Sequence, residues 1–453
     1  MNKKVLAITM VAVIVIAALG AWFLLGNAKS SPNNGAILGK HLIESEYPSA
    51  SSRLWVYGNA NEDDHINSDD VTYLQGIIDG KNSSTTLADA NCDGIIDHND
   101  VDYLKKIING DDMEVFYINN YNKIAAVHWP VNKIATAYCS GAQAVEVANA
   151  TSKVAIADNY ITQNYVAFNK AYASLPSFGE PDDPDYESLI AAGIDVYIIG
   201  YFNSGVDDQL ESKLNPQGID VMFLTCADQA GVDQPNEHMD RTLLMISYLI
   251  QGDMDRAYAY LTWHDGIISK VSAATATLAD SDKQTFLMAR TSPNDKTSDI
   301  SITGKNNINN IHAETAGADS IGQRDPGLTS MYQTVSVEYI IGLDASYYVD
   351  NTHAGFRYGG NETAVNRLHT YMQQDHDRYN GTAYSPHILG MAREAGNGPM
   401  YVIEVVFYQD VLYPNLDNGL DDYGTLFHYY LKHFTSVENP DSVDVSAFFQ
   451  VYA

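Results

Sequence analysis

Two related stretches decide the fold: Tyr186-Glu187-Ser188-Leu189-Ile190-Ala191-Ala192-Gly193-Ile194-Asp195-Val196-Tyr197-Ile198-Ile199 and Val337-Glu338-Tyr339-Ile340-Ile341-Gly342-Leu343-Asp344-Ala345-Ser346-Tyr347-Tyr348-Val349. In both, a glutamate opens a short apolar helix, and a strand begins about eight residues later. Strand and helix signals alternate around each stretch, which indicates parallel α/β sheets. Because the stretches lie in separate blocks of the chain, we expect two α/β lobes.

A long helical stretch separates the two blocks. It runs from about Glu237 to Leu278 without an internal proline and shows a break near Gly252. The sequence therefore predicts a first lobe over residues 113–236, an interlobe helix over 237–280 and a second lobe over 281–453.

This order of lobe, long helix and lobe, with a glutamate at the same place in each lobe, resembles the class III solute-binding proteins of ABC importers. Two further stretches match, Lys133-Ile134-Ala135 after Trp129-Pro130 and Val411-Leu412-Tyr413-Pro414. The resemblance implies two Rossmann-like lobes and a metal chelate or corrinoid as ligand, namely a ferric siderophore, haem or cobalamin. It also implies an ABC permease as partner, docked through Glu187 and Glu338. The alternative is that both are ordinary helix N-terminal acids favoured by the macrodipole.

The same resemblance places the ligand between the lobes, outside the carboxyl ends of the strands. Aromatic and basic side chains expected there could stack on a macrocycle or pair with the carboxylates of a chelate. These candidate ligand-binding residues are Tyr138, Tyr160, Tyr201, Arg290 and Arg357.

An internal repeat precedes the first lobe. Each copy is a twelve-residue loop with oxygen side chains at positions 1, 3, 5, 9 and 12 and a backbone carbonyl at position 7, a spacing that wraps hard ligands around Ca²⁺. The candidate ligands are Asn59, Asn61, Asp63, His65, Asn67 and Asp70 in loop one, and Asp89, Asn91, Asp93, Ile95, Asp97 and Asp100 in loop two. Loop two has more carboxylates and a glycine, Gly94, at the turn, so we expect it to bind Ca²⁺ more strongly.

Each loop runs into a similar short amphipathic helix, and aspartate stands at position 12. Together these features resemble a type I dockerin over residues 53–112, a small all-α module that binds cohesin modules. The resemblance implies cohesin contacts at Ser68, Asp69, His98 and Asn99, with Lys105 and Lys106 nearby. The alternative is a calcium-stiffened spacer.

The N-terminus indicates export. Two lysines precede the uncharged apolar run Val5–Gly26, which is long enough to cross a bilayer as a helix. We expect a membrane anchor, with the bulk of the chain extracellular; a cleaved signal peptide is the alternative. Residues 27–52 are expected to be a flexible linker.

Composition limits the function. The 453 residues carry 26 basic and 57 acidic side chains, a net charge of −31, which argues against nucleic acid as partner. We find no nucleophile elbow, zinc-protease motif or phosphate loop, so we do not expect an enzyme. The leading interpretation is a membrane-tethered ABC-importer binding protein with a calcium-dependent docking module. The main alternative is a surface assembly or adhesion protein that works through dockerin–cohesin docking.

Overall fold

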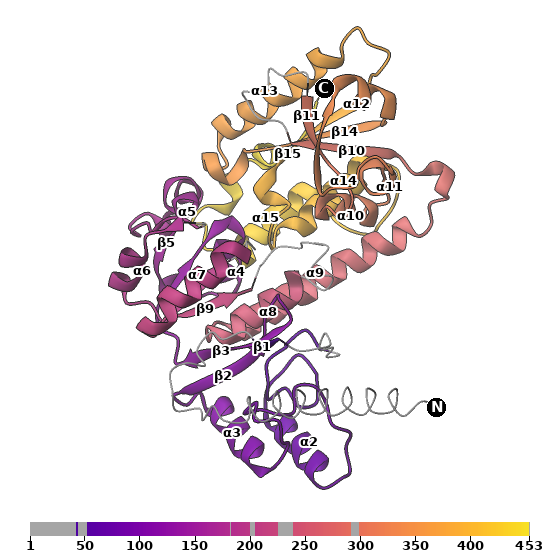
Figure 1. Ribbon diagram of the computed structural model, residues 1–453. Helices are drawn as coiled ribbons and strands as arrows, with labels where there is room; N and C mark the ends of the chain where they lie inside the picture. Colours follow the sequence, from indigo (N-terminus) through magenta and orange to yellow (C-terminus); the bar gives the residue numbers. More distant parts are fainter. Residues whose placement is uncertain are drawn as a thin grey trace, which may run out of the picture.

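The computed structural model describes residues 42–43, 52–181, 183–199, 204–224, 239–290 and 299–452. Figure 1 shows a small helical module that contains α2 and α3, a first lobe beside it, and a second lobe at the other end of a long helix. The two predicted α/β lobes are therefore present.

The first lobe contains a parallel sheet with the strand order β5-β4-β8-β9. Every residue of β8 and β9 is buried, as expected for a parallel sheet covered on both faces. The strands are β4 (Ile134–Thr136), β5 (Val154–Ala157), β8 (Val196–Ile199) and β9 (Asp220–Phe223), and the helices are α4 (Tyr138–Val147), α5 (Asn159–Gln163), α6 (Tyr186–Ala192) and α7 (Ser204–Leu214).

The second lobe contains a mixed sheet with the order β13-β11-β10-β14-β15-β16, and β12 pairs with β10. Only β10, β12, β14 and β15 run parallel, so this lobe departs from a purely parallel Rossmann-like sheet. The strands are β10 (Thr285–Arg290), β11 (Asp299–Thr303), β12 (Asp319–Ser320), β13 (Tyr332–Ser336), β14 (Tyr347–Thr352), β15 (His387–Ala392) and β16 (Phe449–Val451), and the helices are α10 (Ile308–Thr315), α11 (Ile321–Arg324), α12 (Val337–Leu343), α13 (Glu362–Tyr379), α14 (Tyr401–Leu412) and α15 (Tyr423–Phe434).

Two helices connect the lobes, α8 (Met239–Leu249) and α9 (Met254–Thr275). The helical path is interrupted between them at Gln251, which has a φ of 53°. The next residue is Gly252, where a Cβ atom would lie 2.8 Å from the Ala148 carbonyl oxygen, so the close approach requires a glycine. The Lys153 ammonium donates to the carbonyls of Ile250 and Gln251, at 2.6 and 3.2 Å, and so satisfies the end of α8.

The helical module contains α2 (Ser68–Ile78) and α3 (His98–Asn109) and is followed by the hairpin β2 (Met113–Ile118) and β3 (Lys123–Trp129). Leu42–Ile43 forms β1, which pairs with β3. The segment that leads into the module is hydrogen-bonded to the segment that follows it. The Tyr57 amide donates to the Phe116 carbonyl, and the Ile118 amide donates to the Trp55 carbonyl. The module also shares one continuous hydrophobic core with the lobes.

The expected membrane anchor needs correction. Within the described part of the chain, no helix is both long and apolar enough to cross a bilayer. The longest helix in the described part of the chain, α9, has 22 residues and carries four charged side chains, namely Asp255, Arg256, Asp265 and Lys270. The segment Val5–Gly26, on which the expectation rested, lies outside the described residues.

Candidate functional site

Polar side chains lie at or shortly after the carboxyl ends of parallel strands in both lobes, and Tyr332 lies at the start of β13. We name this group the interlobe site. It consists of Tyr138, Tyr160, Arg290, Tyr332, His353, Arg357, Arg393 and Glu394.

The first lobe contributes the two tyrosines. Tyr138 begins α4 with a φ of 60°, a left-handed conformation that is rare for a residue with a side chain. Its amide donates to Oδ2 of Asp158 at 2.8 Å, and the other oxygen of Asp158 accepts from the Ile161 amide at 2.8 Å. The same carboxylate therefore holds the turn before α4 and caps α5, which carries Tyr160. The rings of Tyr138 and Tyr160 lie 5.6 Å apart.

The second lobe contributes a chain of charged groups. Arg357 Nε donates to Glu394 Oε1 at 2.7 Å, and His353 Nδ1 lies 3.1 Å from the same oxygen. Arg393 Nη1 lies 2.8 Å from His353 Nε2. Because arginine only donates, Nε2 accepts this bond, which assigns the proton of His353 to Nδ1.

The two lobes touch at this site. The Arg357 guanidinium lies over the Tyr160 ring, 4.8 Å from its centre. Beneath it, the Phe356 ring packs against Tyr165 and Phe168 of the first lobe at centre distances of 5.0 and 4.6 Å. The aromatic contacts join the lobes, and the arginine and tyrosine lie at their junction.

Positive charge dominates the interlobe site. Burial, and after it the charge of Arg290, lower the pKa of Arg393 to about 10. Arg290 in turn stacks on Tyr332 at 4.4 Å. Burial raises the pKa of Glu394, but His353, Arg357 and Arg393 outweigh it, so the pKa is lowered and the carboxylate stays charged. Arg357 and Arg393 therefore act on one carboxylate, and Arg290 adds a further positive charge at Arg393, a balance that suits an anionic ligand.

Sequence reasoning found part of this site. The structure brings Tyr138, Tyr160 and Arg357 together and stacks Arg290 on Tyr332, whereas Tyr201 lies outside the described residues. Tyr332, at the start of β13, was not predicted. Three further residues were also missed, although they directly follow β14 and β15 and that position was the available signal. They are His353, Arg393 and Glu394.

Another carboxylate lies at a second junction between the lobes. Glu146 on α4 is buried, and Asn169 donates to its Oε1 at 2.5 Å and to Ser436 Oγ, beyond α15, at 2.7 Å. Burial raises the pKa of Glu146 from 4.5 to about 7, although the bond from Asn169 opposes the shift. The folded protein therefore binds this proton more tightly than the unfolded chain does.

Replacing this carboxylate by an amide, in Glu146→Gln, should change how stability depends on pH. The stabilising contribution of the Glu146 proton is complete below pH 4.5 and is lost as the pH rises to about 7. We expect the variant to be more stable than the wild type at pH 8 by about 3 kcal/mol, with the difference shrinking toward pH 4.5. Urea unfolding across this range measures it; a constant difference would contradict the prediction.

The two candidate docking glutamates occupy matching places. Glu187 and Glu338 are each the second residue of a seven-residue helix, and both are exposed. Asp185 and Ser336 cap these helices. Their role in docking stays a prediction.

The two candidate calcium loops fold alike. Position 4 is left-handed in both, with a φ of 52° at Glu62 and 51° at Cys92. Position 9 caps the following helix in both, and the aspartate at position 12, Asp70 or Asp100, completes a capping box. The repeat seen in the sequence is therefore a repeat in structure.

The loop oxygens have the properties of cation ligands. Burial, together with nearby carboxylates, raises the pKa of Asp70 and of Asp89 to about 6, although bonds from backbone amides oppose the shift. The amide oxygen of Asn59 is buried without a hydrogen-bond partner. Among the described residues, no three His, Cys, Asp or Glu side chains form a group that could hold a metal ion. Most loop carboxylates accept hydrogen bonds from backbone amides. The donor set is oxygen-rich and fits Ca²⁺.

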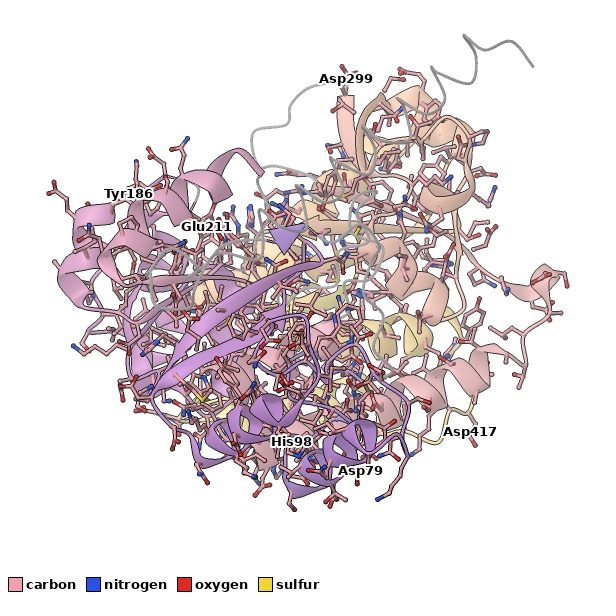
Figure 2. All side chains as sticks on the ribbon, turned by 60° about the horizontal axis from the view of Figure 1, so that its bottom comes forward. Asp79, His98, Tyr186, Glu211, Asp299 and Asp417 are labelled. Atoms are coloured by element: carbon pink, nitrogen blue, oxygen red, sulfur yellow. The ribbon has the colours of Figure 1, made fainter. Side chains whose placement is uncertain are left out.

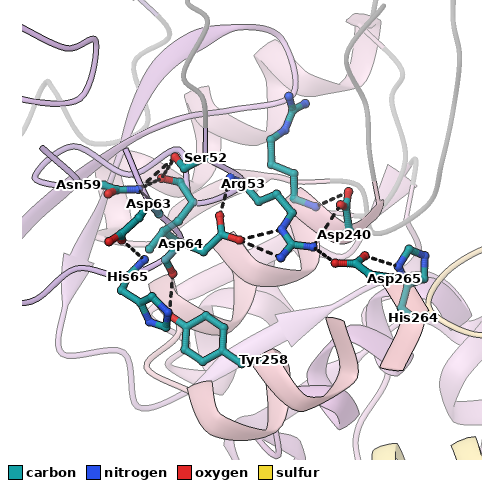
Figure 3. A network of polar contacts seen from close by, with 12 residues as sticks. Ser52, Arg53, Asn59, Asp63, Asp64, His65, Asp240, Tyr258, His264 and Asp265 are labelled. Carbon is teal, nitrogen blue, oxygen red and sulfur yellow. Dashed lines mark hydrogen bonds and ion pairs between the residues drawn. The ribbon is translucent and has the colours of Figure 1, made fainter. Parts of the chain in front are cut away.

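Loop one differs from loop two in being fastened to the interlobe helices (Figure 3). Arg53 donates to Asp64 of the loop through its backbone amide and its Nε, at 2.7 and 2.8 Å. The same guanidinium lies 2.7 Å from Asp265 on α9 and 3.7 Å from Asp240 on α8. Tyr258 on α9 also donates to the Asp64 carbonyl at 2.7 Å.

The residues expected to contact a cohesin are all exposed, namely Ser68, Asp69, His98, Asn99, Lys105 and Lys106. Figure 2 shows His98 on the module, well separated from Tyr186, the neighbour of Glu187 on the first lobe.

Comparison with solved structures identifies the fold. The molybdate-binding periplasmic protein MolA of Haemophilus influenzae has a TM-score of 0.55 and 13% identity over 70% of this chain and 97% of its own. The TroA-like periplasmic binding protein FepB of Veillonella parvula has a TM-score of 0.55 and 13% identity, covering 75% of this chain and 99% of its own. CeuE of Helicobacter pylori has a TM-score of 0.53 and 13% identity, covering 72% and 97%.

These likenesses show that the chain has a mixed α/β fold like that of TroA-like periplasmic binding proteins, so the coarse fold prediction is confirmed. None of the three is described as an enzyme. No family model and no curated protein matches the sequence. The resemblance of residues 53–112 to a dockerin stays a prediction.

Proposed function

We propose that this protein is the solute-binding component of an ABC importer and binds an anionic metal chelate in the interlobe site. The positive charge of that site carries the proposal: among the described residues, Arg357 and Arg393 act on the Glu394 carboxylate, and Arg290 adds its charge at Arg393. In a chain of net charge −31, such a cluster opposes the overall charge. Among the ligands considered, acidic ferric siderophores and haem fit it better than cobalamin.

The test is a titration of the full chain with ferric siderophores, haem and cobalamin, followed by tryptophan fluorescence. We expect micromolar or tighter binding of an anionic chelate, weakened by added salt because exposed charges are screened. If the folded protein binds none of these compounds, the result would contradict the proposal and favour the surface-assembly alternative.

Glu187 and Glu338 are proposed to dock on arginines of the permease, one from each lobe. We expect Glu187→Gln combined with Glu338→Gln to abolish uptake in cells that express the cognate permease while leaving ligand affinity unchanged. Glu362→Gln is the matched control, because Glu362 is also an exposed acid in the first turn of a helix. A loss of ligand affinity in the double variant would contradict the docking role.

We also propose that the module binds Ca²⁺ in both loops, more strongly in loop two, and presents its exposed face to a cohesin-bearing surface protein. The matched loop geometry and the buried, unpartnered oxygen of Asn59 support the calcium sites. Calorimetric titration of the full chain with Ca²⁺ tests this, and Asp89→Asn is expected to remove the tighter of two binding events.

A further inference from the structure

We infer that one buried carboxylate in each lobe, Asp158 in the first and Glu394 in the second, positions the side chains that face the ligand. The inference rests on the proposed function and assigns these two residues to the supporting layer of the same site. Both residues are buried, with exposed fractions of 0% for Asp158 and 7% for Glu394.

In the first lobe, Asp158 joins two turns that would otherwise be independent. One of its oxygens binds the Tyr138 amide, and the other binds the Ile161 amide at the start of α5. Tyr138 needs such support, because a left-handed tyrosine is strained and persists only where the surroundings fix it. Both oxygens of Asp158 are directed at the protein, so its effect on a ligand must pass through Tyr138 and Tyr160.

In the second lobe, Glu394 gathers cations that would repel one another. Its Oε1 accepts from Arg357 and from His353, and His353 in turn accepts from Arg393. A single carboxylate thus sets the direction of a histidine and two arginines. Without its charge these groups would separate, and the distances that a chelate requires would be lost.

The experiment for the first lobe separates positioning from helix capping. In Asp158→Ser, the hydroxyl can still cap α5 but cannot also reach the Tyr138 amide. The control is Asp185→Ser, which makes the same change at the cap of α6, away from the interlobe site. The probe is the ferric complex of 2,3-dihydroxybenzoate, a small anionic iron chelate, and binding is followed by fluorescence quenching of the full chain.

We expect Asp158→Ser to lower the affinity for this chelate about 10-fold and to speed hydrogen exchange at the Tyr138 amide by a similar factor, with no change in the control. Wild-type affinity in the variant, or an unchanged Tyr138 amide, would overturn the inference. If the wild type does not bind the chelate, the result contradicts the proposed function. Hydrogen exchange at the Tyr138 amide would still show whether Asp158 holds Tyr138 in place.

The experiment for the second lobe uses Glu394→Gln, which keeps the shape and one acceptor oxygen but removes the charge. Because Glu394 raises the pKa of His353 against the effect of burial, the variant should lower that pKa further. Nuclear magnetic resonance titration of the imidazole measures this without any ligand. We expect chelate affinity to fall about 10-fold as well. If the pKa of His353 or the affinity is unchanged in the variant, Glu394 does not position these side chains.

Discussion

Reversing one charge in the interlobe site, with Arg290→Glu, should lower the affinity for an anionic chelate about 100-fold. The change removes an attractive charge and adds a repulsive one at a position where opposite charge across an interface contributes strongly. The same substitution should leave the protein folded and slightly more stable, by less than about 1 kcal/mol, because it relieves the repulsion between Arg290 and Arg393. Loss of affinity without loss of stability is typical of a residue retained for binding.

The measurement pairs chelate titration with urea unfolding of the same samples. Lys432→Glu is the control, since it makes an equal change of charge at an exposed position of α15 that is not part of the interlobe site. If the control lowers affinity as much as Arg290→Glu does, the effect comes from the net charge of the protein. If Arg290→Glu binds the chelate normally, the charge cluster does not hold the ligand.

The lobes could be predicted from the sequence because local patterns specify them. The stretches that begin at Glu187 and Glu338 form α6 with β8 and α12 with β14, as expected. The mixed sheet of the second lobe could not be predicted, because one of its antiparallel pairs joins strands that are far apart in the chain. β16 pairs with β15 although their residues, Val451 and Leu389, lie far apart in the chain.

Only some residues of the interlobe site could be predicted from the sequence. Tyr138, Tyr160 and Arg357 could be proposed because aromatic and basic side chains after strand ends suit ligand binding. Glu394 could not, since it is one of 57 acidic residues and only packing shows that His353 and Arg357 surround it. The membrane prediction rested on the apolar run Val5–Gly26 and the lysines before it. Within the described residues, no helix is long and apolar enough to cross a bilayer.

The module and the lobes should unfold together, because their contact is extensive. Trp55 packs under the Arg241 guanidinium at 4.0 Å, and Arg53 links loop one to both interlobe helices. A path of contacts continues from Asp265 to His264 at 3.0 Å and from His264 to the Tyr401 hydroxyl at 2.6 Å, at the start of α14. Whatever stabilises loop one is therefore connected to the core of the second lobe.

We accordingly expect Ca²⁺ to raise the temperature at which the lobes unfold by about 5 °C relative to chelator-treated protein, since an ion that binds only the folded state stabilises everything that unfolds with it. Arg53→Met should reduce this shift by at least half while calorimetric titration still detects Ca²⁺ binding. Lys81→Met removes an exposed cation from the module without touching the lobes and should leave the shift intact.

Scanning calorimetry distinguishes the possible outcomes. A single transition that moves with Ca²⁺ in the wild type, and two transitions in Arg53→Met of which only the smaller moves, would establish that Arg53 transmits the effect. Two transitions in the wild type would instead show that the module unfolds independently despite the shared core. In that case Ca²⁺ would act on partner binding alone, and the link between loop one and α9 would have no energetic consequence for the lobes.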